Sequence, residues 1–204
     1  MTEHKPRQAT LDKKRKILEI ALECFINHGV AGTTIDMIKA LSGMSVGSLY
    51  HHFGNKDKIA AAVFIEGMRQ FGQLARQYLS EVKAADGSAE EGVKALVYAN
   101  IDWIEENPDW ARFVFQHRSA VTSAGKENSL NSELKAFRYD LIEWFMPFVQ
   151  KGVFRAMPME ILSAQITGPT HEYARHWLSG RYQQPLTTHK TTLAEAAWRA
   201  VKAD

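Results

Sequence analysis

The sequence predicts an all-α protein with two domains. Apolar residues recur at three- and four-residue spacing along most of the 204 residues, which is the period of a helix with one buried face. Ser or Thr caps and Gly stops divide this pattern into segments of helical length, and no convincing β-strand alternation appears. With 45% apolar and 24% charged residues, the composition is that of a packed globular protein and excludes a disordered or fibrous chain.

Four helices are predicted in the first part of the chain. The first follows Thr10 and ends at Gly29, the usual left-handed stop. Thr33-x-x-Asp36 forms a capping box that opens the second helix, although Thr34 could be the cap instead. Ser45 is placed to cap the third. The expected ranges are 11–28, a short helix to about Ser42, 46–52 and 56–82.

Five more helices are predicted after the linker Ala85-Asp86-Gly87. A second capping box, Ser88-x-x-Glu91, opens the first of them. Residues 119–131 are rich in Ser, Thr, Asn and Gly and predict a loop, and Gly168-Pro169 should kink the penultimate helix. The expected ranges are 89–106, 108–117, 132–151, 158–179 and 192–203, which gives an N-terminal domain 1–58 and a C-terminal domain 59–204.

Charge is concentrated at the N-terminal end. Residues 1–58 hold nine Lys/Arg and six Asp/Glu, whereas the whole chain carries a net charge of only +2. Lys13-Lys14-Arg15-Lys16, preceded by Lys5 and Arg7, would attract a polyanion if the fold presents it on one surface; a solvated helix face is the alternative. The single cysteine, Cys24, and the absence of an apolar stretch long enough for a bilayer predict a cytoplasmic protein without a membrane partner.

Residues 33–58 have the layout of a helix-turn-helix, because a short helix, a tight turn through a glycine and a second short helix precede a long helix. At about 100° per residue, Leu49 and Phe53 fall on the core side of the second short helix. Gly47 and His51 fall on the opposite side. The core of the domain does not explain the residues on this outward face, so we expect a partner to bind against it.

The side chains of this face suit double-stranded DNA. Val46 could touch a thymine methyl, and Gly47 would let the backbone approach a base edge. Phosphates or bases could be bound by Tyr50, His51 and His52. Further hydroxyl and ammonium groups close to this helix come from Thr33, Thr34, Ser45 and Lys56.

Two neighbouring runs of residues together resemble the N-terminal signature of the TetR family of transcriptional regulators. They are Thr33-Thr34-Ile35-x-x-Ile38 and Ser42-Gly43-Met44-Ser45-Val46-Gly47-Ser48-Leu49-Tyr50-His51-His52-Phe53-Gly54-Asn55-Lys56-Asp57. The resemblance implies a homodimer, usually a repressor, whose second short helix enters the major groove of a palindromic operator. A C-terminal domain would bind a small effector that weakens DNA binding.

By position, the groove-reading residues of the family fall on Val46, Gly47, Ser48, Tyr50 and His51. Its phosphate contacts fall on Thr33, Thr34, Tyr50, His52 and Lys56. Where some members carry long polar side chains, this sequence has Val46 and Gly47, which leaves a larger share of recognition to the basic arm or to DNA shape.

Two motifs compete with this interpretation. Gly43-x-Ser45-x-Gly47 fits the nucleophile elbow of a hydrolase, but that motif needs a strand before the serine, and helical spacing precedes Ser45. His171-Glu172-x-x-x-His176 resembles a zinc motif but separates the two histidines by five residues, which places them on different faces of a helix. We therefore expect no catalytic residue, no metal and no cofactor; a helical hydrolase that uses Ser45 remains the enzymatic alternative.

The C-terminal domain offers candidates for an effector site. Asn100 lies in an otherwise apolar row and is either a satisfied core amide or a polar group in a ligand cavity. Aromatic residues predict an effector with a large apolar or aromatic part. The candidate set is Asn100, Trp103, Trp110, Phe113, His117, Tyr139 and His171. A protein-interaction module without any effector is the other alternative.

Helix 132–151 predicts dimerisation, because apolar residues cover two of its sides. Leu134, Phe137, Leu141, Phe145 and Phe148 lie along one side, and Ile142, Met146 and Val149 along another. Paired with helix 158–179, it would form a four-helix contact across a two-fold axis. The alternative is a helix buried on both sides within one subunit.

Overall fold

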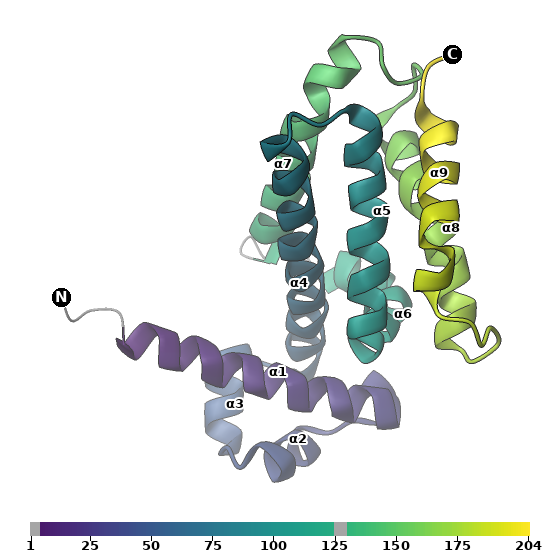
Figure 1. Cartoon of the computed structure of the whole chain (residues 1–204). Coiled ribbons are helices and arrows are strands. Elements are labelled where there is room, and N and C mark those ends of the chain that lie inside the picture. The colour runs from purple at the N-terminus through teal and green to yellow at the C-terminus, as the bar shows by residue number, and fades with distance from the viewer. Residues whose placement is uncertain (1–4, 125–129) are drawn as a thin grey trace. The chain divides into compact units, whose positions relative to one another are not determined.

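The computed structural model describes the backbone of residues 5–124 and 130–204, and the side chains of residues 13–117 and 135–204. Within these ranges the chain is helical, and its only extended pairing is an isolated bridge between Phe154 and Lys202. The prediction of an all-α protein is confirmed (Figure 1). The described elements are α1 (Lys5–Gly32), α2 (Ile35–Ser42), α3 (Val46–Phe53), α4 (Lys56–Ala84), α5 (Ala89–Glu106), α6 (Pro108–Ala124), α7 (Leu130–Gln150), α8 (Met159–Leu178), the 3-10 helix η1 (Leu186–His189) and α9 (Lys190–Val201).

Most predicted boundaries agree within a few residues, and the differences have local causes. The segment predicted as a loop at 119–131 is helical up to Ala124 and again from Leu130, and residues 125–129 lie outside the described part. Polar residues such as Ser and Thr lower helix propensity only slightly, so they do not stop a helix as Gly or Pro does. Pro169 lies inside α8, which runs as one helix from Met159 to Leu178.

The chain forms two compact units. The first contains Met1–Met68 and Phe113–Ser132, and the second contains Arg69–Arg112 and Glu133–Asp204. The first unit therefore extends past residue 58, where we predicted the domain boundary. Ile59 and Val63, in the first turns of α4, are fully buried, so these turns complete the core of the first unit. α4 is an uninterrupted helix, so no local break in the sequence marks this division.

The core of the first unit is built on one face of α1. Its buried residues are Ile17, Leu18, Ala21, Leu22, Cys24 and Phe25, and they recur at helical spacing. Phe25 stacks on Phe113 of α6 with ring centroids 5.5 Å apart. Ile38 of α2 and Leu49 of α3 are at most 1% exposed. Each short helix is thus fixed by its own buried anchor.

The second unit has α5 as its most buried helix, and α5, α8 and α9 lie side by side (Figure 1). Ser88 caps α5 and forms the predicted capping box with Glu91. A Cβ added at Gly92 would lie 1.9 Å from the ring of Trp144 on α7, so only glycine permits this contact. Close packing therefore decides the identity of residue 92.

A polar cluster joins three helices of the second unit. The ammonium of Lys190 on α9 lies 2.6 and 2.7 Å from the two carboxylate oxygens of Asp102 on α5. Tyr78 on α4 donates its hydroxyl proton to the same carboxylate. This hydrogen bond, together with burial, raises the pKa of Tyr78 to about 12. One carboxylate thus holds α4, α5 and α9 together.

Candidate functional site

The turn between α2 and α3 is fixed by two hydroxyl caps and one glycine. The hydroxyl of Thr34 accepts from the backbone N–H of Met37 at 3.3 Å, so Thr34 caps α2. Gly43 has φ 65° and ends the helix in the left-handed region, where glycine is favoured. Ser45 then accepts from Ser48 N–H at 3.2 Å and starts α3. The helix-turn-helix predicted from the sequence is present with this geometry.

Thr33 has a different role from the one we predicted. Its side chain is 1% exposed, and its hydroxyl lies 3.0 Å from the carbonyl oxygen of Cys24 and 2.8 Å from that of Gly29. Its single proton is therefore used inside the first unit, where it ties down the end of α1. Because the Thr33 hydroxyl is used in this way, Thr33 neither opens the capping box of α2 nor donates to a phosphate, as we had predicted.

The two faces of α3 lie as the helical projection predicts. Leu49 and Phe53 are buried at 1% and 7% exposure, whereas Tyr50 is 50% exposed. His51 and His52 are also exposed, and their rings stack with centroids 5.5 Å apart. Val46 and Ser48 are half-buried. The polar and aromatic face that we predicted to meet DNA is thus open within its own unit.

Gly47 lies on this open face. A Cβ added there would have no neighbour within 4 Å, so packing does not require glycine at residue 47. Glycine in a helix interior costs roughly 0.5–1 kcal/mol relative to alanine. A residue that weakens its helix without serving the core is consistent with close approach of a partner.

Lys56, at the start of α4, also departs from its predicted role. Its ammonium donates to the carbonyl oxygen of Ala31 at 3.0 Å and to that of Thr33 at 2.9 Å. Lys56 therefore crosslinks the connection between α1 and α2 to the N-terminus of α4. The prediction treated this side chain as a free phosphate ligand, but at most one of its three protons remains for that purpose.

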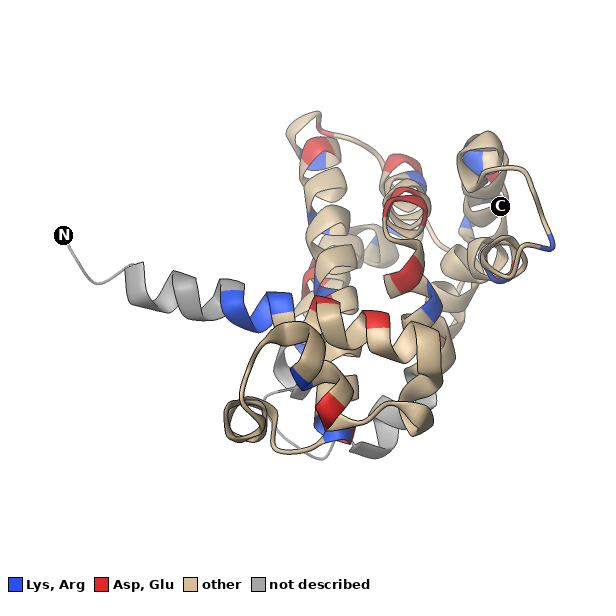
Figure 2. Ribbon diagram, turned by 90° about the horizontal axis from the view of Figure 1, so that it is seen from below, with Lys and Arg blue, Asp and Glu red and all other residues tan. Residues whose placement is uncertain are grey.

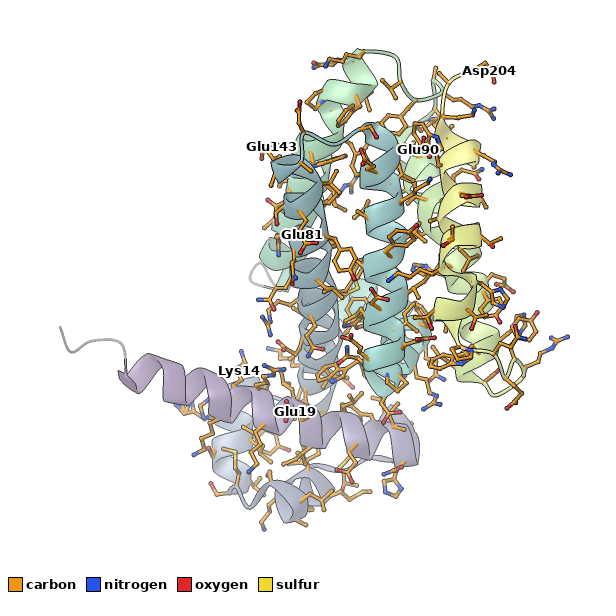
Figure 3. All side chains as sticks on the ribbon, in the orientation of Figure 1. Lys14, Glu19, Glu81, Glu90, Glu143 and Asp204 are labelled. Carbon is orange, nitrogen blue, oxygen red and sulfur yellow. The ribbon has the colours of Figure 1, made fainter. Side chains whose placement is uncertain are left out.

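The basic segment Lys13–Lys16 is exposed on α1, where Figure 2 shows it as a blue stretch of the helix. The ammonium of Lys14 lies 5.8 Å from the centroid of the Phe53 ring, so the segment is adjacent to the C-terminal end of α3. Within the segment, Arg15 forms an ion pair with Glu19 at 3.4 Å. Lys14 and Glu19 are labelled on α1 in Figure 3. The positive charge and the exposed face of α3 belong to the same unit.

The two competing motifs do not form the sites that they resemble. Helix α2 precedes Ser45, where a nucleophile elbow needs a strand. His171 lies 3.3 Å from the amide nitrogen of Asn100, whereas His176 lies 3.2 Å from Glu172. Glu172 is also bonded to Arg175, which lowers the pKa of the Glu172 carboxyl. Among the described residues, no group of three or more His, Cys, Asp or Glu side chains is placed to hold a metal ion.

The effector candidates divide between the two units. Asn100, Trp103 and His171 lie in the second unit, and Asn100 and His171 are hydrogen-bonded to each other. Trp110 is also in the second unit and is buried. Tyr139, by contrast, is 68% exposed on α7, and its role in effector binding stays a prediction.

Phe113 and His117 belong to the first unit, where their rings lie 4.4 Å apart. Phe113 is core, stacked on Phe25. Burial lowers the pKa of His117, because the charged imidazolium is disfavoured away from water. These two residues therefore do not join the group formed by Asn100 and His171.

Sequence reasoning missed Thr170, which is 1% exposed on α8. Its hydroxyl has no hydrogen-bond partner, and the same is true of the Asn100 side-chain oxygen and the Trp103 indole nitrogen. A signal was present, because Thr170 continues the buried row of Leu162 and Ile166 at four-residue spacing. A hydroxyl in that row should have been treated in the same way as Asn100.

The surface predicted for dimerisation is apolar and partly exposed. On α7, Phe137 and Phe145 are buried, Leu141, Ile142 and Val149 are half-buried and Met146 is 36% exposed. Ile161 on α8 is 48% exposed. Leu134 lies outside the residues whose side chains are described.

Within the described part of the chain, no helix has the length and apolarity to cross a membrane.

Comparisons with known proteins agree with this geometry. Residues 17–63 match the sequence profile described as "Bacterial regulatory proteins, tetR family". Over 94 residues the chain is 33% identical to "HTH-type transcriptional repressor AcnR" of Corynebacterium jeikeium, and the match covers 45% of this chain and 45% of that protein. The chain thus aligns with less than half the length of this curated relative.

Solved structures extend the likeness in fold to nearly the whole chain. A TetR family transcription regulator from Marinobacter aquaeolei superposes with a TM-score of 0.80 at 20% identity, covering 97% of this chain and all of that one. FadR from Bacillus subtilis, solved in complex with stearoyl-CoA, gives a TM-score of 0.65 at 15% identity and covers 90% of this chain and 96% of that one. Residues 17–63 thus match the tetR family of bacterial regulatory proteins, and the chain as a whole shares the fold of solved TetR family regulators.

Proposed function

We propose that this protein is a transcriptional regulator, most simply a repressor, that binds double-stranded DNA through α3. The observation that carries the proposal is the division of α3 into a buried face with Leu49 and Phe53 and an open face with Gly47, Tyr50 and His51. A helix of this kind fits the major groove, where base edges can be read. The relative AcnR is named a transcriptional repressor, which supports the same role.

The proposed contacts fall into two groups. Val46, Gly47, Ser48, Tyr50 and His51 read base edges. Phosphates are bound by Thr34, Ser45, His52 and the segment Lys13–Lys16, all of which are exposed. Lys56 acts mainly by holding the unit in shape, and Thr33 is left out because its hydroxyl is committed inside the protein. Recognition then depends strongly on phosphate contacts.

A homodimer would bring two copies of α3 to a palindromic operator. The half-exposed apolar residues of α7 and α8 supply a surface for a second copy of the chain, since Met146 and Ile161 have no core to enter. The two-fold symmetry of such a dimer would be matched by an inverted repeat in the DNA. Because DNA is the proposed partner, we place the protein in the cytoplasm.

A small ligand bound in the second unit would release the DNA. α4 belongs to both units, so a change at its C-terminal part could be transmitted along one helix to the DNA-binding unit. The ligand can act only if it binds the two states with different affinity. FadR, which shares the fold, has been solved with stearoyl-CoA, and this supports a ligand site for the fold. We propose no catalytic role.

The test is DNA binding by the full chain to the region upstream of its own gene, measured by fluorescence anisotropy at several salt concentrations. We expect affinity to fall steeply with salt, as phosphate contacts require. His51→Ala should reduce the preference for that region over random DNA, because it removes a base-reading group at a cost of about 1–3 kcal/mol. Equal affinity for the two DNAs in the wild type would contradict the proposal.

A further inference from the structure

In the described part of the second unit, three buried side-chain polar atoms lack a hydrogen-bond partner. They are the Asn100 Oδ1, the Trp103 Nε1 and the Thr170 Oγ1, whose residues are 4%, 4% and 1% exposed. A buried polar group without a partner costs free energy, and native proteins keep few of them. These three atoms belong to the neighbouring helices α5 and α8.

The contact between Asn100 and His171 places α5 and α8 against each other at these residues. Asn100 and Trp103 lie three residues apart on α5 and therefore share a face. The amide nitrogen of Asn100 lies 3.3 Å from Nε2 of His171, the residue after Thr170 on α8. Whichever way the amide is turned, only one of its polar atoms can meet that nitrogen, and the other stays without a partner.

The face of α5 that carries Asn100 is otherwise apolar. One turn before and after Asn100, the same face of α5 carries Leu96, Val97 and Ile104. Two acidic residues of α5 are bound to lysines: Glu90, labelled in Figure 3, pairs with Lys94 at 2.6 Å, and Asp102 holds Lys190. Burial of an ionised ligand group here would leave its charge without a counter-ion.

We propose that Asn100, Trp103 and Thr170 form the polar end of a ligand site for a neutral molecule that carries both a hydrogen-bond donor and an acceptor, such as a primary amide or a hydroxyl, on an apolar body. The indole N–H can only donate, so it needs the acceptor of the ligand. The free amide atom of Asn100 takes the complementary group, and the Thr170 hydroxyl can do either. The inference rests on the proposed function, because it names the ligand class of that regulator.

The indole N–H of Trp103 provides a reporter at the site. The chain has five tryptophans, so a ¹⁵N-labelled sample gives five indole signals, and Trp103→Phe identifies the one from residue 103. The matched probes are benzamide, benzoate and toluene at millimolar concentration. Benzamide should shift the Trp103 signal downfield and bind at least about tenfold more tightly than benzoate, which brings an unpaired charge. Toluene should not cause the downfield shift.

Thr170→Val and Thr167→Val form a matched pair of variants on α8. Thr167 already donates to the carbonyl oxygen of Ser163 at 3.0 Å, so its hydroxyl is satisfied. Thr170→Val should weaken benzamide binding about fivefold, whereas Thr167→Val should leave it unchanged. Without any probe, Thr170→Val should keep or raise the Tm, because it removes an unpartnered buried hydroxyl. A clear fall in Tm would mean that the Thr170 hydroxyl serves the fold, and would overturn the proposal.

The same samples separate this inference from the proposed function. Both variants should bind upstream DNA like the wild type, since neither residue belongs to the first unit. If DNA binding is intact but benzamide leaves the Trp103 signal unmoved, or benzoate binds equally well, the polar atoms are satisfied by bound water only and the inference is wrong. If benzamide binds as expected while no sample binds DNA, the proposed function fails and the ligand site stands.

Discussion

α3 and α5 place their polar residues in opposite environments. In α3, two of the eight residues are buried, and Tyr50, His51 and His52 are exposed. In α5, eleven of the 18 residues are buried, and Asn100 is among them. An exposed polar side chain does not destabilise the fold, so the polar residues on the open face of α3 indicate a binding surface for a partner. A buried polar atom carries a cost, so its meaning depends on what it meets inside.

The largest effect should come from the buried face of α3. Leu49→Ala removes a fully buried side chain and should cost about 3 kcal/mol of unfolding free energy, measured by urea denaturation. Its neighbour Tyr50→Ala, half exposed, should stay within about 0.5 kcal/mol of the wild type and yet weaken DNA binding. Similar losses of stability in the two variants would mean that α3 is not divided into two faces.

Two aspartates of the second unit should also differ in how much they stabilise the fold, because one is mostly buried and the other is exposed. Asp102→Asn breaks the cluster with Tyr78 and Lys190, where the carboxylate is 16% exposed, and should cost about 2 kcal/mol. Asp140→Asn breaks the ion pair with Arg76. Because the side chains of Asp140 and Arg76 are 47% and 40% exposed, this variant should lose less than about 0.5 kcal/mol of unfolding free energy. Thermal unfolding of both variants at one pH provides the measurement, and equal Tm losses would contradict the assigned roles.

Gly47 tests whether the open face of α3 is reserved for DNA. Gly47→Ala should stabilise the protein by about 0.5–1 kcal/mol, since the new Cβ meets nothing, but should weaken binding to upstream DNA. Gly168→Ala in α8 has the same open space and should leave DNA binding unchanged. Unchanged DNA affinity in Gly47→Ala would remove the argument for close approach at this residue.

A smaller effect is expected from a single cation of α1. Lys16→Ala should flatten the slope of log affinity against log salt by about one unit, because one phosphate contact is lost. Lys151→Ala, an exposed lysine that follows α7, should not change the slope. Anisotropy titrations at four salt concentrations would measure both slopes, and a matching change in the two variants would indicate a general charge effect.

The smallest effect concerns pH. Burial lowers the pKa of His117 below its ordinary value of 6.5, so below pH 6.5 the unfolded chain binds more protons than the folded one. The contribution of this side chain to stability is therefore complete above pH 6.5 and is lost as the pH falls toward the lower pKa of the folded state. His117→Gln should show a smaller loss of Tm between pH 7 and pH 5 than the wild type. An identical loss would show that His117 does not titrate as its burial requires.

The sequence was most informative where local rules decide the structure. The caps Ser45 and Ser88 and the stop at Gly43 act on their own helices, so their positions could be predicted from spacing alone. The inward and outward faces of α3 follow from the helical period in the same way. The ambiguity between Thr33 and Thr34 could not be settled locally, because Thr33 is committed to carbonyl oxygens at the end of α1.

Helical periodicity does not settle which of the candidate effector residues line a cavity. Periodicity marks Asn100 and Trp103 as buried but does not say what their polar atoms meet. Tyr139 has the same chemical character as a cavity residue and is nevertheless exposed on α7. Spacing within one helix cannot tell which neighbouring helix, if any, covers a given side chain.

The amino-acid sequence by itself determined most of the helices, the caps Ser45 and Ser88, the two faces of α3 and the likeness of residues 17–63 to the tetR family, because each depends on residues within a few turns of one another. Only the tertiary structure decided that Lys56 and Thr33 are bound to backbone carbonyls, that α4 is shared between two units, and that Asn100, Trp103 and Thr170 keep unpartnered atoms. These features depend on contacts between segments distant in the chain, and hydrogen-bond satisfaction is set by which of those segments meet.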